Sequence, residues 1–342
     1  MTWDPAAGVM ACGHCGNRQA VTLAGTAVRE HAFAELAGLP AKPVAKLGTA
    51  FICPNCGAQT ESDLLSANCQ FCGTPLVADP AAIERVAPEA VVPFGISKQR
   101  AGGALKKWTS SRWFAPSSLK KVSSAETFTG SYLPFWTYDS NTVSGYTGER
   151  GEHYYVTETY TQEIDGQQVT QTRQVQKTRW HPARGRVSRF FDDVLVPGTT
   201  KAGTNLLGKL EPWELQTAVP FQQNYLAGFQ AVRYDIEPEQ GLESAKAQMA
   251  PVIENDCRAD IGGDEQRVRT VNTAYYDLAY KLLFLPVWFL SYRHAGKLFQ
   301  VMINAHTSEV AGHRPYSAIR ITLTILAALI VIVGIVLAVR LH

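Results

Sequence analysis

The chain has 342 residues, of which 46% are hydrophobic and 18% are charged, and its formal net charge is +2. Ordinary soluble domains carry about 25% charged residues, so the charged share is low. A balance near zero excludes a uniformly basic or acidic protein, but the charges are segregated. Residues 98–121 hold seven basic side chains and residues 166–191 hold six, with no acid in either stretch. The rest of the chain is therefore acidic.

Six of the seven cysteines form three CxxC pairs, each followed by glycine. In a reducing compartment this spacing favours a metal over a disulfide. The second and third pairs have twelve residues between them, which leaves room for a hairpin that brings both pairs to one tetrahedral site. We expect a structural Zn²⁺ held by four thiolates, with no position left open for catalysis: Cys53, Cys56, Cys69 and Cys72.

Cys12 and Cys15 supply only half of such a site. The residues before them, 3–8, read as a turn between two short strands. We expect the pair to be the second half of a zinc ribbon whose first half lies upstream of Met1. A site shared across a dimer, or a pair that binds nothing, remains the alternative. Cys257, in a helical stretch, is expected to be a small buried residue.

In chain order, the composition predicts six segments. They are a partial zinc ribbon (1–20), a helix and linker (21–50), a zinc ribbon (51–78), a β-rich α+β domain (90–235), an α+β subdomain (236–316) and a transmembrane helix (319–340). The motif LPFW at 133–136 is echoed by LPVW at 285–288, which suggests two related subdomains, although chance recurrence explains the echo equally well. The fold class predicted is α+β.

Runs of aromatic and β-branched residues predict strands at 132–139, 153–161, 167–180 and 187–198. Asp165-Gly166 is a hairpin signal between the second and third runs. Alternation in the third run puts Arg173, Lys177 and Arg179 on one face; charges solvated without a partner are the alternative interpretation. The run LLFLPVWFL (282–290) predicts a buried strand, and the residues after it predict an antiparallel meander.

One long helix is predicted to begin at Pro238, because apolar residues recur there at helical spacing. The stripe is typical of a helix that packs on a core. Pro251 lies inside the pattern and is expected to kink the helix or end it early.

Residues 321–339 contain nineteen residues, sixteen of them apolar and none charged, with arginine on both sides. At 1.5 Å per residue this length is about 28 Å, close to the bilayer core. The N-terminus has no basic and apolar leader, and the basic residues around the span favour a cytosolic body. We therefore expect a single-pass protein of the bacterial inner membrane, anchored by its tail, with lipid bilayer as one partner.

No complete catalytic motif is present. Residues 203–209 match GxxxxGK, but Leu210 stands where the magnesium-ligating hydroxyl belongs. Asp264-Glu265-Gln266-Arg267 resembles a helicase acidic box, yet it follows Gly262-Gly263 rather than an apolar run and reads as a loop. The prediction is a protein that is not an enzyme.

The order of parts resembles bacterial membrane-anchored double zinc-ribbon proteins, through the segments YLPFWTYD (132–139), GERGEHYYVTETYT (148–161) and FFDDVLVPG (190–198). That family is described as carrying transcription factor IIB-type zinc ribbons or as primosomal-helicase-like. The resemblance implies zinc at the CxxC pairs, and it implies PspA-type or SPFH-type membrane proteins as partners in a membrane-stress response.

The function expected from these observations is a non-enzymatic adaptor that binds proteins at the cytosolic membrane face. The alternative is a nucleic-acid-binding zinc-ribbon protein, because basic strands also suit phosphate backbones. Against that alternative, the segment from Cys53 to Cys72 contains no lysine or arginine but does contain Glu61 and Asp63.

Overall fold

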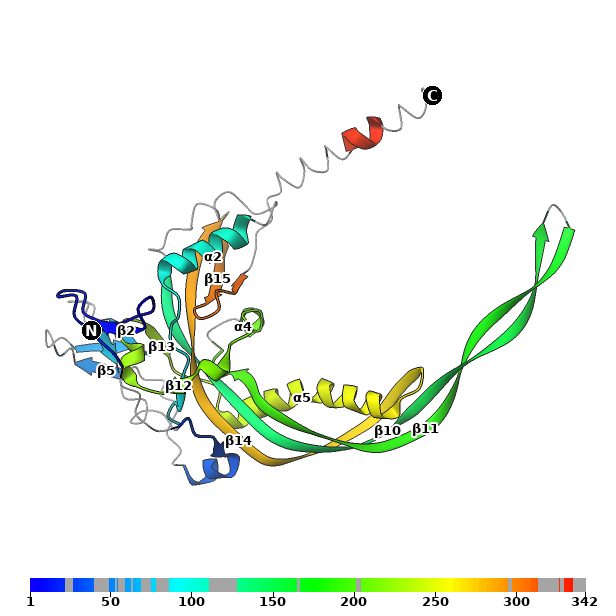
Figure 1. Ribbon diagram of the computed structural model, residues 1–342, viewed down its shortest axis with the longest axis horizontal. Helices are drawn as coiled ribbons and strands as arrows, with labels where there is room; N and C mark the ends of the chain where they lie inside the picture. Colours follow the sequence, from blue (N-terminus) through cyan, green and yellow to red (C-terminus); the bar gives the residue numbers. More distant parts are fainter. Residues whose placement is uncertain are drawn as a thin grey trace.

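The computed structural model describes residues 1–21, 27–39, 49–52, 54, 59–62, 64–68, 75–77, 86–110, 128–164, 167–200, 204–294, 297–312, 326 and 329–334. Three strands dominate this part of the chain: β10 (Thr129–Ile164), β11 (Gln167–Pro197) and β14 (Glu265–His294). β10 lies between the other two and is antiparallel to both. Figure 1 shows the three strands bending together beneath one long helix.

The main sheet contains eleven strands and runs in the order β12-β9-β14-β10-β13-β7-β8. β11 pairs with β10, while β4 and β15 pair with β14, and β16 pairs with β15. The shorter strands have these bounds: β4 His31–Ala32, β7 Leu64–Asn68, β8 Pro75–Val77, β9 Ala90–Val91, β12 Val219–Pro220, β13 Gln230–Val232, β15 Lys297–Asn304 and β16 Val310–Gly312.

Two small sheets, three α-helices and three 3₁₀ helices, one of them the short η3 (Leu215–Thr217), are also described. The sheets are β1 (Thr2–Asp4), β2 (Val9–Ala11) and β3 (Arg18–Gln19) in one, and β5 (Thr49–Ile52) with β6 (Gln59–Ser62) in the other. The α-helices are α2 (Lys98–Ser110), α4 (Thr204–Leu207) and α5 (Pro238–Ile261). The longer 3₁₀ helices are η1 (Phe33–Gly38) and η4 (Gln223–Leu226).

Helix α5 fills the concave side of the bent strands (Figure 1). Its buried stripe repeats at helical spacing and includes Leu242, Met249 and Ile253, which pack with Trp136 and Tyr138 of β10. Of the two effects expected of Pro251, an early end of the helix does not occur, because α5 continues to Ile261. Pro251 and Ala247, the residue four positions before it, are both exposed, so water can satisfy the carbonyl that loses its helical partner.

Hydrogen bonds fix both ends of α5 to the sheet. At its start, the Tyr138 hydroxyl donates to the carbonyl of Pro238 over 2.6 Å. Near its end, the Tyr146 hydroxyl donates to Asp260 over 2.6 Å, and Arg189 of β11 forms two bonds of 2.6 Å to Asp256. These hydrogen bonds therefore hold both ends of α5 against the sheet.

Two bulges lie at the same level of the sheet and account for its bend. β11 carries one extra residue between Tyr138 and Ser140 of β10, and β14 carries one between Asp139 and Asn141. In each bulged strand an aspartate adopts a left-handed backbone, Asp193 and Asp277, both with φ of 50°. Bulges bend the strand that contains them and increase its twist.

The α+β prediction with N-terminal ribbons ahead of a two-part body is wrong. The described residues form a β-rich fold in which β10, from the first expected part, pairs with β14, from the second. The N-terminal segments are also part of this fold. Trp3 donates its indole N–H to the carbonyl of Phe94 over 3.0 Å and packs in the core, and β7 pairs with β13.

The predicted membrane-spanning helix, 319–340, falls mostly outside the described residues. Among the helices that the structure does describe, none combines the length and the apolar character needed to cross a membrane. The cytosolic placement of the body stays a prediction.

Two glycines of β10 provide a matched test of this packing. A Cβ on Gly148 would meet the backbone carbonyl of Arg267 and come within 2.9 Å of Ile261, whereas a Cβ on Gly145 would meet nothing within 4 Å. Gly148→Ala should lower the free energy of unfolding by about 1–3 kcal/mol. Gly145→Ala should not lower it. Urea denaturation of both variants checks the difference, and equal effects would contradict the close approach of β14 and α5 to β10.

Candidate functional site: a projecting ribbon

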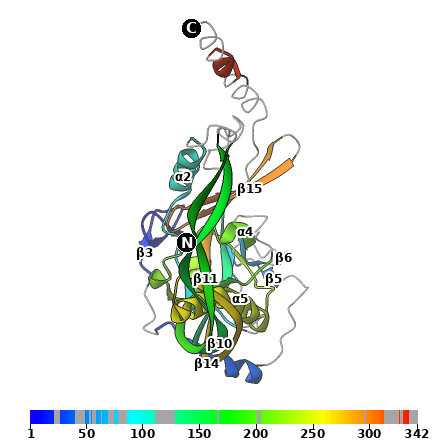
Figure 2. The ribbon, with the colours of Figure 1, turned by 90° about the vertical axis from the view of Figure 1, so that its right-hand side faces the viewer.

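β10 and β11 continue as a two-stranded ribbon beyond the end of β14. Gly151 pairs with Trp180 on one side and with Glu265, the first residue of β14, on the other. Past this level β10 and β11 pair without a break to Ile164 and Gln167. The thirteen further residues of each strand extend about 43 Å at about 3.3 Å per residue. Figure 1 shows this ribbon standing clear of the body, and Figure 2, in which the right-hand side of Figure 1 faces the viewer, shows it in front of the body.

The predicted hairpin is confirmed by this pairing, although its two turn residues, 165 and 166, lie outside the described residues. The ribbon was not recognised as one element in the sequence, because three glycines at 145–151 resemble a break between strands. We define the arm as residues 152–164 and 167–179.

One face of the arm carries a ladder of aromatic and charged side chains. Arg179 lies 5.0 Å from the Tyr154 ring and Arg173 lies 5.5 Å from the Tyr160 ring. Glu158 contacts Lys177 at 2.9 Å and Arg173 at 3.5 Å. The Lys177 hydrogen bond lowers the pKa of Glu158. The prediction that the three basic residues share a face is confirmed, but they have partners within the arm rather than standing alone.

The opposite face is uncharged over most of its length. Most of its side chains are threonine and glutamine, contributed by the two strands together. Tyr155, on the same face, is 63% exposed. Because this face has few charges to attract water strongly, a partner could cover it at a smaller desolvation cost than the first face. Its central pairs are Thr157 with Gln174, Thr159 with Thr172, and Thr161 with Thr170.

A network of polar side chains holds the end of the arm that adjoins the body. His153 accepts a hydrogen bond from Gln176 at Nδ1 (2.7 Å) and donates from Nε2 to Glu265 (2.9 Å). Thr178 also donates to Glu265, and this bond, with the one from His153, lowers the pKa of the carboxyl group. Arg267 stacks on the Trp180 ring at 3.7 Å. The start of β14 therefore holds the arm in one direction.

A second cluster of functional groups lies at the bulges. Carboxyl oxygens of Glu30, Asp139 and Asp193 lie within 4.8 Å of one another, a geometry that could hold a metal. The ammonium of Lys281 occupies the cationic position, 2.9 Å from Glu30 and 2.5 Å from Asp193. We therefore interpret the cluster as an ionic lock that holds the segment before β4 against the sheet. Sequence analysis missed it because its members lie on four separate segments.

The lock should make stability depend on pH. Burial, with a hydrogen bond to Glu30, raises the pKa of Asp139 from 3.8 to about 7. The folded chain then binds more protons than the unfolded chain between these values, so this group's contribution to stability falls as pH rises from about 4 to 7. Asp139→Asn keeps the donor and acceptor and should flatten that fall, which denaturation measured at pH 5, 6, 7 and 8 would show.

Glu30 works in the opposite sense, because hydrogen bonds from Asp139 and Lys281 lower its pKa. Its contribution is lost only in more acidic solution, as pH falls through that lowered value. Asp256→Asn, outside the lock, serves as the control and should leave the fall between pH 4 and 7 in place. An Asp139→Asn profile identical to that of the unchanged protein would show that Asp139 is ionised throughout.

Cys12 and Cys15 are the described pair among the three CxxC pairs, and among the described residues no further ligand completes a metal site with them. Cys12 and Cys15 lie beyond β2, and hydrogen bonds from the backbone of Cys15 and His14 lower the pKa of Cys12 to about 7. Among the described residues, the group able to hold a metal is acidic and contains no cysteine. The description as a zinc-ribbon membrane protein is corrected to this extent: the described residues contain neither a cysteine cluster able to hold a metal nor a helix able to cross a membrane.

The remaining cysteine predictions have different outcomes. Cys53, Cys56, Cys69 and Cys72 lie outside the described residues, so metal ligation by them stays a prediction. The turn expected at 3–8 is confirmed, because β1 and β2 pair across it. Cys257 is fully buried in α5, as expected.

Comparison with known proteins yields one relative to report. A curated protein from Bacillus subtilis (strain 168), named "Uncharacterized protein YdjG", is 28% identical over 236 residues. The match covers 68% of this chain but 65% of the relative, less than two thirds of its length. No family model and no solved structure matches the chain. The relative's name states no activity, so function has to be argued from the site.

Proposed function

We propose that the protein is a non-enzymatic adaptor that uses the arm to bind a partner protein. The observation that carries the proposal is the free ribbon itself. Two-stranded ribbons are marginally stable alone, and this one extends about 43 Å from the body. A chain gains nothing in core burial from such an extension, so a role in contact with another molecule explains it better than a role in stability.

The two edges of the arm differ in a way that indicates where a partner binds. The outer edge belongs to β11, which carries the basic residues Arg173, Lys177 and Arg179 within the arm, and such residues discourage pairing with a further strand. The other edge belongs to β10, and from Glu152 to Ile164 it has no lysine, arginine, proline or glycine. Among the described residues, β11 is the one strand that pairs with β10 beyond Gly151, so the other edge of β10 is open there.

An extended segment of a partner could therefore add to β10 in line with β14. Main-chain hydrogen bonds supply the affinity in such strand addition, and side chains on the two faces supply the selectivity. The uncharged threonine and glutamine face lies beside this edge. PspA-type and SPFH-type proteins, which the family resemblance implies, are the first partners to test.

Nucleic-acid binding has less support as the role of the arm. Its basic side chains Arg173 and Lys177 already contact Glu158. A phosphate would have to displace that carboxylate, which reduces the gain from each contact. We therefore do not propose the arm as a nucleic-acid site.

Two matched double variants test the proposal. Thr157→Lys with Thr159→Lys places charge on the open β10 edge, whereas Thr172→Lys with Gln174→Lys places the same charge on the paired residues of β11. Lysine on an edge discourages strand addition. Affinity for a purified PspA-type or SPFH-type partner, measured by calorimetry, should fall at least about tenfold for the β10 pair (about 1.4 kcal/mol).

The β11 pair should retain most of the affinity, because its substitutions lie on the same face but away from the open edge. Equal losses would show that the partner covers the face rather than the edge. If neither pair changes the binding of a partner that does bind, the arm is not the interaction site and the proposal is wrong.

A further inference from the structure

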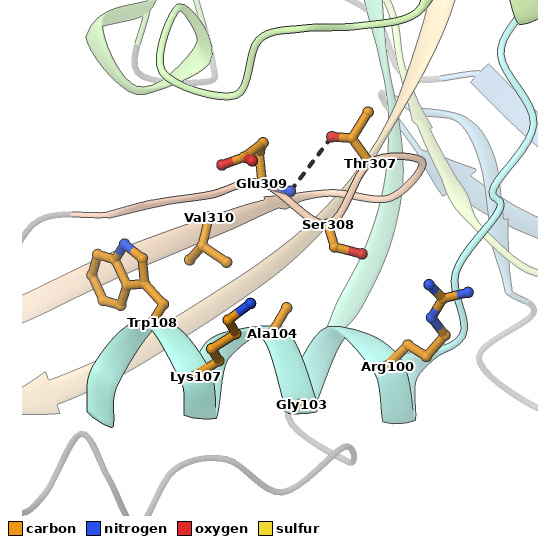
Figure 3. A pocket seen from close by; sticks show the side chains of 9 residues that line it. All are labelled: Arg100, Gly103, Ala104, Lys107, Trp108, Thr307, Ser308, Glu309 and Val310. Atoms are coloured by element: carbon orange, nitrogen blue, oxygen red, sulfur yellow. Dashed lines mark hydrogen bonds between the residues drawn. The ribbon is translucent and has the colours of Figure 1, made fainter. Parts of the chain in front are cut away.

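A basic groove lies on the body, away from the arm, between α2 and the turn that joins β15 to β16. The groove has a volume of about 490 Å³. One wall is helical and includes Arg100, Lys107 and Trp108; the other wall includes Thr307 and Ser308 of the turn. Figure 3 shows the side chains of Arg100 and Lys107 rising from the helix toward that turn.

The helix that forms the first wall carries four basic residues and no acid: Lys98, Arg100, Lys106 and Lys107. Its apolar side is used in the core, since Ala101 and Leu105 are fully buried, and its basic side is exposed. Among the described residues, no carboxylate lies within ion-pair distance of these four side chains. The basic residues of β11 differ, because several of them have acidic partners.

The charge at the start of α2 is opposite to the usual preference. Helix N-termini carry a partial positive charge, so acidic side chains are favoured in the first turn. Here the first turn has no acid and contains Arg100, which lines the groove. The local positive potential is thus left without compensation from the described part of the chain, and an anion in the groove would supply it.

The opposite wall is rigidly placed. Asn304 is fully buried and accepts backbone hydrogen bonds from His306 (2.9 Å) and Thr307 (3.1 Å), while its side-chain amide donates to the carbonyl of Leu210 (3.0 Å). Ser308 is held with a φ of 75°. In Figure 3 the Ser308 hydroxyl lies on the groove side, whereas the Glu309 carboxylate points away from the helix.

We propose that this groove binds a small phosphate-bearing anion. Arg100 supplies the planar fork that suits phosphate oxygens. Lys107, seven residues and so about 10 Å further along the helix axis, supplies a second positive charge, and Ser308 supplies a hydroxyl donor from the other wall. The groove's size suits a small phosphate ester rather than a long polymer.

The test is binding of inorganic phosphate and of glycerol phosphate to the full chain, measured by calorimetry at constant ionic strength with chloride as the competing anion. We expect saturable binding at one site. Arg100→Gln combined with Lys107→Gln should weaken it at least about tenfold, because each removes a charge-assisted contact. Circular dichroism confirms that the variant is folded.

Lys106→Gln combined with Lys98→Gln is the matched control, since it makes the same charge change on the same helix outside the groove lining. This variant should bind within about twofold of the unchanged protein. Equal weakening by both variants would show a diffuse electrostatic effect and overturn the proposal. So would the absence of saturable phosphate binding, or tight binding of a DNA duplex that phosphate does not compete away.

Discussion

β10 is hydrogen-bonded to β14 from Thr129 to Gly151 and to β11 from Phe135 to Ile164. This double pairing of one strand is the constraint on which the rest of the molecule depends. It joins segments far apart in the sequence into one sheet, provides the concave surface for α5, and sets the level at which β14 ends. Past that level the same strand, paired on one side, becomes the arm.

The direction of the arm follows from features well away from it. The bulges at Asp193 and Asp277 bend both neighbours of β10 at one level, and the Lys281 lock holds the N-terminal segment against the same place. At the other end of β14, Glu265 and Arg267 hold His153 and Trp180. The bend at the bulges and the contacts of Glu265 and Arg267 together set the direction of the ribbon. Substitutions at either place should therefore alter partner binding, although neither place touches the partner.

Some elements could be predicted because their signals are local. Alternation from Val169 to Trp180, the apolar run before Ser291 and the apolar stripe after Pro238 each specify an element through near neighbours in sequence. The unbroken length of β10 could not be predicted, since Gly148 and Gly151 read as chain breaks. They are glycine because β14, α5 and Trp180 approach β10 too closely for a side chain. That crowding comes from distant residues, as do the lock and the packing of Trp3 under Phe94.

The low charged share and the near-zero net charge hide two different uses of basic residues. On β11 several of them contact acidic side chains, and on α2 they are exposed beside a groove. The contrast separates a candidate protein-binding edge from a candidate anion site.

The central claim is that β10 has an open edge beyond Gly151. Amide hydrogen exchange resolved by residue tests it most directly. The account predicts alternation along 152–163, with amides that point toward β11 protected and those that point outward exchanging rapidly, and protection of the outward set when a partner is added. Uniform protection in the isolated chain, or uniform rapid exchange along both strands, would contradict it.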